Sequence, residues 1–100
     1  NFLPLCMVSN NKSEIYWNFQ DICPFEGYDI GLKFAQISGY HLANVPYNSS
    51  FAGFKDWFLL NYNKPGFTIE AGIGKSPLPL SQFDQIYQDN IGILLLATII

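Results

Sequence analysis

A chain of 100 residues is long enough for one compact domain or for part of a larger one. Charged residues make up 13% and apolar residues 49%, whereas globular proteins carry about 25% charged residues, so we expect part of the surface to meet more protein. The net charge is −3 and the basic residues are scattered, which excludes a basic nucleic-acid-binding patch. The longest apolar run, Ile91–Ile100, is too short for a membrane-spanning helix.

The N-terminal half is predicted to hold two strands and a helix. The apolar run Leu3–Val8 predicts a buried strand, and the aromatic-rich stretch Glu14–Phe19 predicts a second one. Glu26–Gly39 is predicted to be a helix with Gly39 as its C-cap. Tyr40–Val45 fits either a strand or a loop. The apolar stripe of the helix is formed by Tyr28, Leu32, Ala35 and Gln36, widened by Ile30, Phe34 and Ile37.

The C-terminal half is predicted to hold two helices around a strand. Ser50 can cap a helix over Phe51–Asn61, whose shared face holds Phe51, Phe54, Lys55 and Phe58, with Trp57 beside it. Ser81 can cap a final helix that continues to Ile100 and is apolar on nearly every side after Gly92, so its end should be buried. Its periodic face holds Phe83, Ile86, Tyr87, Asn90, Ile91 and Leu94. Strands that alternate with helices predict an α/β fold, with residues 1–100 as a single partial domain.

The stretch PGFTIEAGIG, residues 65–74, predicts a short buried strand that ends in an acid. Phe67–Ile69 suits a strand, Glu70 follows it, and Gly72 and Gly74 predict a turn. Because strand ends in α/β sheets often display catalytic groups, Glu70 is a candidate for chemistry. The alternative is a solvated loop acid or a carboxylate that caps the next turn.

The chain offers no metal-ligand pattern of its own. His41 is the single histidine, and there is no HxxE, HxxH or cluster of carboxylates, so we predict no metal site within this chain. Cys6 and Cys23 fit no metal or redox motif, and either two buried thiols or a disulfide would account for them. Asn11 and Asn48 begin glycosylation sequons, a pattern that is frequent by chance.

Three blocks of sequence carry a family resemblance. They are SSFAGFKDWF at 49–58, KPGFTIEAG at 64–72, and GKSPLP at 74–79 followed by Phe83. Together they resemble the C-terminal part of the zinc carboxypeptidase family, within its branch of bacterial peptidases that cut γ-D-glutamyl–diaminopimelate bonds in cell-wall peptides. The resemblance covers Tyr47–Leu96, and the thirteen residues from Trp57 to Glu70 match the family's spacing.

The resemblance implies roles for three residues. Glu70 is similar to the catalytic glutamate that activates the zinc-bound water and then delivers a proton to the leaving amine. Tyr47 is similar to the tyrosine of the mobile loop that closes over a peptide substrate. Lys55 falls near the floor of the pocket for the substrate side chain, where a cation would suit an anionic group; the alternative is a solvated helix lysine. The family branch implies a location in the bacterial cytoplasm or cell envelope.

The chain departs from the family in the zinc ligands. The HxxE pair and the substrate-binding arginines belong to an N-terminal half that is not part of this sequence, and Ser9 falls where the later zinc-binding histidine is expected. Zinc is therefore implied only for a complete family member, and the missing half or another chain is expected to cover the apolar surface. The second hypothesis is a non-catalytic remnant or an interaction module, which could dimerise through that surface.

Overall fold

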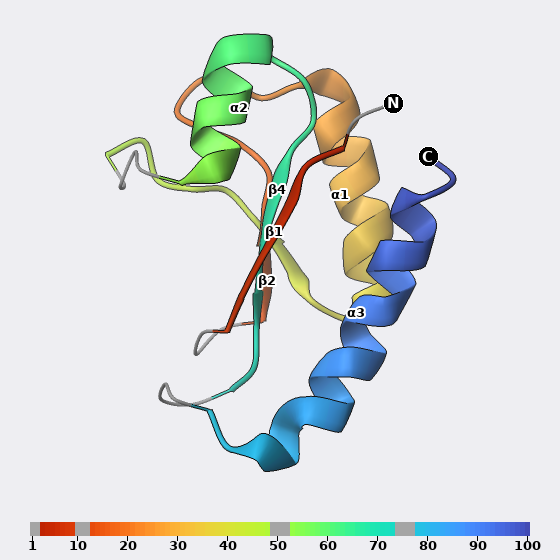
Figure 1. Ribbon diagram of the computed structural model, residues 1–100. Coiled ribbons are helices and arrows are strands. Elements are labelled where there is room, and N and C mark those ends of the chain that lie inside the picture. The colour runs from red at the N-terminus through yellow and green to blue at the C-terminus, as the bar shows by residue number, and fades with distance from the viewer. Residues whose placement is uncertain (1–2, 10–12, 49–52, 74–77) are drawn as a thin grey trace.

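The computed structural model describes residues 3–9, 13–48, 53–73 and 78–100 (Figure 1). The described elements, in chain order, are β1 (Leu5–Ser9), β2 (Glu14–Tyr16), α1 (Phe25–Ser38), β3 (His41–Ala43), α2 (Phe54–Tyr62), β4 (Phe67–Ala71), a 3₁₀ turn (Leu80–Gln82) and α3 (Phe83–Ala97). The α/β class predicted from the sequence is confirmed, and Tyr40–Val45 resolves into the short strand β3.

Within the described ranges, the strands form one mixed sheet in the order β1-β4-β2-β3. β4 lies in the interior of the sheet, parallel to β1 and antiparallel to β2, and β3 extends the sheet parallel to β2. Glu70 is paired with Val8 on one side and with Glu14 on the other. The sheet therefore carries Glu70 on one of its inner strands.

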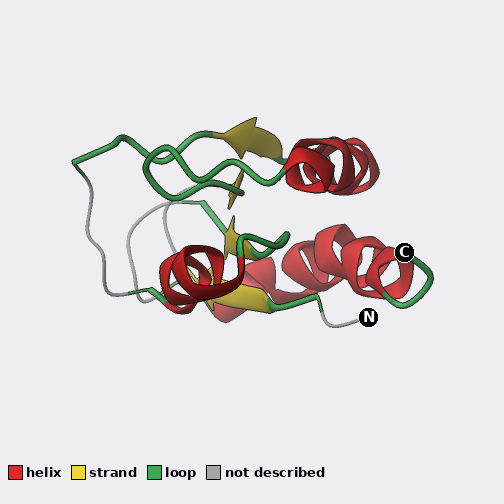
Figure 2. Cartoon of the chain, turned by 90° about the horizontal axis from the view of Figure 1, so that it is seen from above, coloured by secondary structure: helices red, strands yellow, loops and turns green. Residues whose placement is uncertain are grey.

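Two helices cover one face of this sheet. α1 and α3 pack side by side on that face, whereas α2 lies on the other side, near one end of the strands (Figures 1 and 2). The core between the sheet and the α1–α3 layer includes Ile15, Phe34, Phe67, Ile69 and Ile93. The rings of Phe34 and Phe67 meet edge to face, with centroids 5.1 Å apart.

The predicted strands lie where the structure has strands, but their first and last residues differ. β1 starts after Pro4, whose carbonyl accepts a hydrogen bond from the backbone N–H of Phe67. β2 stops at Tyr16 because the chain then turns back, with Phe19 and Ile22 bonded to each other across the turn. β4 runs on to Ala71, so the prediction that the strand ends before Glu70 is wrong.

α1 packs through buried glycines and through only part of its predicted apolar stripe, because Ile30 and Ala35 pack against the core beside Phe34. Tyr28, Leu32 and Ile37 are exposed, and Phe34 is the buried member of the stripe. Gly31 is also buried, and a Cβ there would lie 2.7 Å from Cδ1 of Leu42. The absence of a side chain at this position lets the helix approach β3 closely, which a pattern of large apolar residues does not reveal.

Gly39 ends α1 as predicted, in the left-handed conformation with φ 79° and its N–H bonded to the carbonyl of Ala35. We expect Gly39→Ala to lower the free energy of unfolding by about 1 kcal/mol, because nothing crowds this position and the cost is conformational. Gly39→Asn should cost less, since asparagine tolerates this backbone conformation. Urea unfolding measures both variants; equal losses would contradict the assignment.

α2 and α3 begin later than predicted. α2 starts at Phe54 with Gly53 as its N-cap, and the predicted cap Ser50 and first residue Phe51 lie outside the described residues. α3 starts at Phe83, and Ser81 belongs to the preceding 3₁₀ turn instead of capping the helix.

The apolar faces predicted for these two helices are only partly buried. On α2, Phe58 and Lys55 are buried as part of the shared face, but Phe54 and Trp57 are exposed. On α3, the buried residues are Asn90 and Ile93. Leu95 and Ile99 are 62% and 79% exposed, so the prediction that the apolar end is buried is wrong for this chain. Leu96 and Ala97 do pack against the core, so this end of α3 is covered on one side and exposed on the other.

Candidate functional site

Glu70 lies on the face of the sheet opposite the α1–α3 layer. Burial alternates along β4, with Phe67, Ile69 and Ala71 buried and Thr68 and Glu70 half-buried between them. Because successive side chains of a strand point to opposite faces, Glu70 is directed away from the main core. A solvated loop acid is therefore the wrong interpretation: Glu70 is a half-buried carboxylate on a strand.

A second acid and a tyrosine share this face. Glu14 lies directly opposite Glu70 in the antiparallel β2–β4 pair. The hydroxyl of Tyr16 donates a hydrogen bond to Oε1 of Glu14 over 2.7 Å. Burial raises the pKa of Tyr16 well above its ordinary value, and the hydrogen bond to Glu14 and the charge of Glu70 add to the rise. We call Glu14, Tyr16 and Glu70 the carboxylate cluster; sequence reasoning missed its first two members, which the strand register alone reveals.

The backbone just beyond Glu70 is held at two points. Ser13 Oγ donates a hydrogen bond to the carbonyl of Gly72 over 3.3 Å. The side-chain amide of Gln82 bonds both the N–H and the carbonyl of Ile73, at 2.9 and 2.6 Å. These contacts fix the start of the predicted glycine turn, whose remainder from Gly74 onward lies outside the described residues.

Lys55 is buried in an ion pair. Its ammonium is 2.5 Å from Oδ1 of Asp56 and donates a second hydrogen bond to the carbonyl of Asn18. Lys55 is 4% exposed, so the alternative of a solvated helix lysine is wrong. Asn18 in turn bonds the N–H and the carbonyl of Val45 through its side chain. Lys55 thus ties α2 to the segments that follow β2 and β3.

Tyr47 lies in the turn after β3, and its side chain is 56% exposed. The register aligns Glu70 with Glu14 and with His41 at the start of β3, while Tyr47 follows the other end of that strand. The structure therefore brings Tyr47 and Lys55 to one end of the sheet and Glu70 toward the other. A substrate contact from Tyr47 or Lys55 remains a prediction.

The cysteines and the possible metal ligands give no second site in the described residues. Cys6 is half-buried, Cys23 is exposed and both are free, so neither the disulfide nor the pair of buried thiols is found. In the ranges that the structure describes, no three His, Cys, Asp or Glu side chains are grouped as metal ligands. The described residues therefore offer no zinc site by themselves. Ser9 ends β1 with its backbone beside Ala71, one residue from Glu70.

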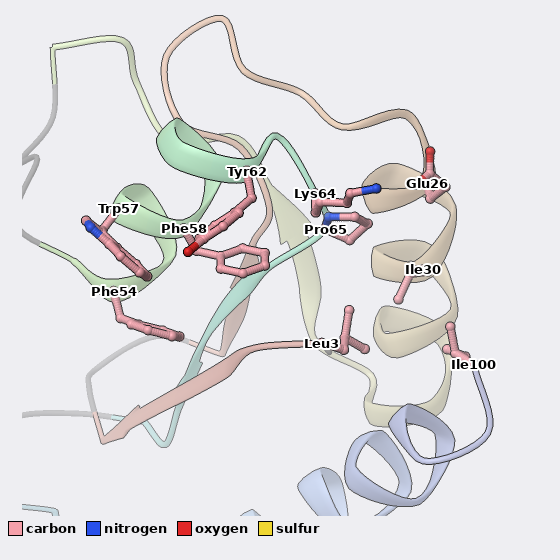
Figure 3. A pocket seen from close by; sticks show the side chains of 10 residues that line it. All are labelled: Leu3, Glu26, Ile30, Phe54, Trp57, Phe58, Tyr62, Lys64, Pro65 and Ile100. Atoms are coloured by element: carbon pink, nitrogen blue, oxygen red, sulfur yellow. The ribbon is translucent and has the colours of Figure 1, made fainter. Parts of the chain in front are cut away.

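An apolar hollow of about 750 Å³ lies between α2 and the α1–α3 layer (Figure 3). Its α2 side holds aromatic rings, its opposite wall holds aliphatic side chains, and Glu26 and Lys64 stand at its rim. The lining residues are Leu3, Glu26, Ile30, Phe54, Trp57, Phe58, Tyr62, Lys64, Pro65 and Ile100. We call this cavity the aromatic hollow. The helical spacing of Phe54 and Phe58 indicates an apolar face on α2. From the sequence alone, that spacing predicts a buried face and not a cavity.

Tyr40, which contacts Asn90 of α3, makes the stability of the fold depend on pH. Burial and the negative charge of Asp89 raise the pKa of Tyr40 from 10.0 to about 12, against a hydrogen bond from Asn90. The folded state therefore favours the neutral phenol, and this stabilisation is complete below pH 10 and is lost as the pH rises toward 12. We expect urea unfolding to show a smaller loss of stability over this range in Tyr40→Phe than in the unchanged chain; equal losses would contradict the prediction.

Comparison with known proteins relates the chain to part of a peptidase. It is 44% identical over 95 residues to gamma-D-glutamyl-L-diamino acid endopeptidase 1 of Lysinibacillus sphaericus, which covers 95% of the chain and 24% of that protein. It is 42% identical over 90 residues to the uncharacterized protein YqgT of Bacillus subtilis, again 24% of that protein. The chain thus spans about a quarter of the length of these curated relatives. No family model and no solved structure matches it.

No helix in the described part of the chain has both the length and the apolarity needed to cross a membrane.

Proposed function

We propose that the chain is the C-terminal part of a zinc carboxypeptidase-like hydrolase that cleaves γ-D-glutamyl–diamino acid bonds in cell-wall peptides. The observation that carries this proposal is the similarity to an endopeptidase named for that bond, over 95% of the chain. The rest of the hydrolase would supply the zinc ligands and much of the substrate site.

Within this proposal, Glu70 is the general base. It takes a proton from the attacking water and passes it to the leaving amine, a role that a half-buried carboxylate on a rigid strand can perform. The carboxylate cluster supports the role, because Glu14 and Tyr16 provide a partly desolvated setting beside Glu70. Tyr47 is proposed to contact the substrate, and Lys55 to position the segment that carries Tyr47 through its bond to Asn18.

The test uses a chimera in which this chain replaces the 95 matched residues of the Lysinibacillus sphaericus endopeptidase. The substrates are two synthetic peptides that differ only in whether D-glutamate is joined to diaminopimelate through its γ- or its α-carboxyl group. We expect cleavage of the γ-linked peptide, with the α-linked peptide left intact. A folded chimera that cleaves neither peptide would refute the proposal.

A second candidate function is a non-catalytic remnant. Ser9 favours this function, because it stands where the family places a zinc-binding histidine. The backbone of Ser9 pairs with Ala71, the residue after Glu70. Calorimetric titration of the folded chimera with zinc separates the two functions. Stoichiometric binding supports the hydrolase, and no binding supports the remnant.

A further inference from the structure

Among the described residues, β1 is an edge strand without the usual protection. It is the outer strand on its side of the sheet, and its sequence LCMVS contains neither a charged residue nor a proline. Edge strands expose unpaired N–H and C=O groups, and stable proteins shield them with charges, prolines or a covering segment. Met7, on this strand, is 39% exposed. We therefore expect β1 to be covered by more protein.

An apolar groove of about 290 Å³ follows β1 along α3. Met7 and Ala71 form its sheet side, and six residues of α3 form the other: Phe83, Ile86, Tyr87, Asn90, Ile91 and Leu94. We call this the α3 groove. These six residues make up the periodic face that the sequence predicts for this helix, yet Phe83 and Tyr87 are 64% and 51% exposed. The groove therefore has the apolar character of a surface that packs against a helix, but no helix of the described residues covers it.

Two further features mark the same side as incomplete. Oδ1 of Asn90, in the wall of the groove, is buried and accepts no hydrogen bond from the described residues, although the Nδ2 of that amide is bonded to Tyr40 and Ile86. A buried acceptor without a donor is destabilising. The aromatic hollow adjoins Leu3, two residues before β1 begins (Figure 3), and the α3 groove adjoins Met7 within β1, so both apolar cavities lie along the edge strand.

We propose that β1 pairs with a further β-strand and that the α3 groove receives a helix, both supplied by the remainder of a longer polypeptide. The curated relatives are about four times as long as the matched region, so they possess the residues to form such a unit. A strand with an adjoining helix fits because β1 is already parallel to β4 and helices cover this face of the sheet. The inference rests on the proposed place of the chain in a longer peptidase, but not on its catalysis.

Hydrogen exchange followed by mass spectrometry tests this proposal. The peptide that covers β1 is compared between the 100-residue chain alone and the chimera. We expect its amides to exchange at least about tenfold more slowly in the chimera. Leu94→Lys should remove that protection by placing a charge in the groove, whereas Leu60→Lys, the same change on an exposed position of α2, should leave it intact. Circular dichroism of each variant in the chain alone, where both leucines are exposed, confirms that the substitution does not unfold it.

Equally fast exchange of β1 in both proteins would overturn the proposal. The proposal would also be overturned if the isolated chain formed a dimer in sedimentation experiments and Leu94→Lys dissociated that dimer. A second copy of the chain would then occupy the groove. A chimera that protects β1 but hydrolyses nothing would support the inference and count against the hydrolase function.

Discussion

Glu70→Gln in the chimera is expected to lower kcat for the γ-linked peptide by about 100-fold or more, with little change in KM. Glutamine keeps the size and shape of the side chain, so the packing on β4 is preserved while the proton acceptor is lost. A general base acts in the transition state, which is why the loss should fall on kcat rather than on substrate binding.

Two control variants separate this effect from a general loss of negative charge. Glu26→Gln alters an exposed acid in the first turn of α1 and should leave kcat unchanged. Glu14→Gln alters the neighbour of Glu70 within the carboxylate cluster and should have a smaller effect than Glu70→Gln. If Glu70→Gln retained kcat within about threefold of the unchanged chimera, Glu70 would not be the base.

Lys55→Ala is expected to lower the free energy of unfolding of the chain by about 3 kcal/mol. The substitution leaves the carboxylate of Asp56, 7% exposed, without its cation, and removes a donor from the carbonyl of Asn18. Removing one partner of a buried ion pair costs more than the pair itself contributes, because the remaining charge stays desolvated. Urea unfolding followed by circular dichroism measures the loss.

Lys33→Ala is the matched control, because Lys33 is exposed on α1; we expect it to change the stability by less than about 0.5 kcal/mol. The double variant Lys55→Ala/Asp56→Ala should recover part of the loss, since no unpaired charge then remains. A loss below about 1 kcal/mol for Lys55→Ala would show that water reaches Asp56 and that the pair does not hold α2 in place.

The fold class was accessible from the sequence because strand-like and helix-like stretches alternate along it. The helix faces were only partly accessible, for two physical reasons. α1 approaches β3 through Gly31, and a glycine adds no apolar signal to a periodic pattern. α3 has an apolar stripe that the pattern identified correctly, but a pattern cannot state whether the partner of a stripe is present in the same chain.

The residues of the candidate site were also only partly predictable from the sequence. Glu70 was identified from its strand and its spacing to Trp57, but its neighbours depend on the strand order β1-β4-β2-β3, which no local pattern encodes. Lys55 and Asp56 are adjacent charges at the start of a helix, a position that is usually solvated, so their burial could not be foreseen. Tyr47 was placed by resemblance alone, and the register puts it toward the end of the sheet away from Glu70.

The proposed function requires this chain, with its own residues, to take part in peptide hydrolysis. The most direct measurement compares the rate of cleavage of the γ-linked peptide by the chimera with native Ser9 and by its Ser9→His variant. We expect measurable hydrolysis with native Ser9, and a rate that Ser9→His changes by less than about tenfold. Hydrolysis that is absent with native Ser9 and appears only in Ser9→His would contradict the proposed function and identify the chain as a remnant.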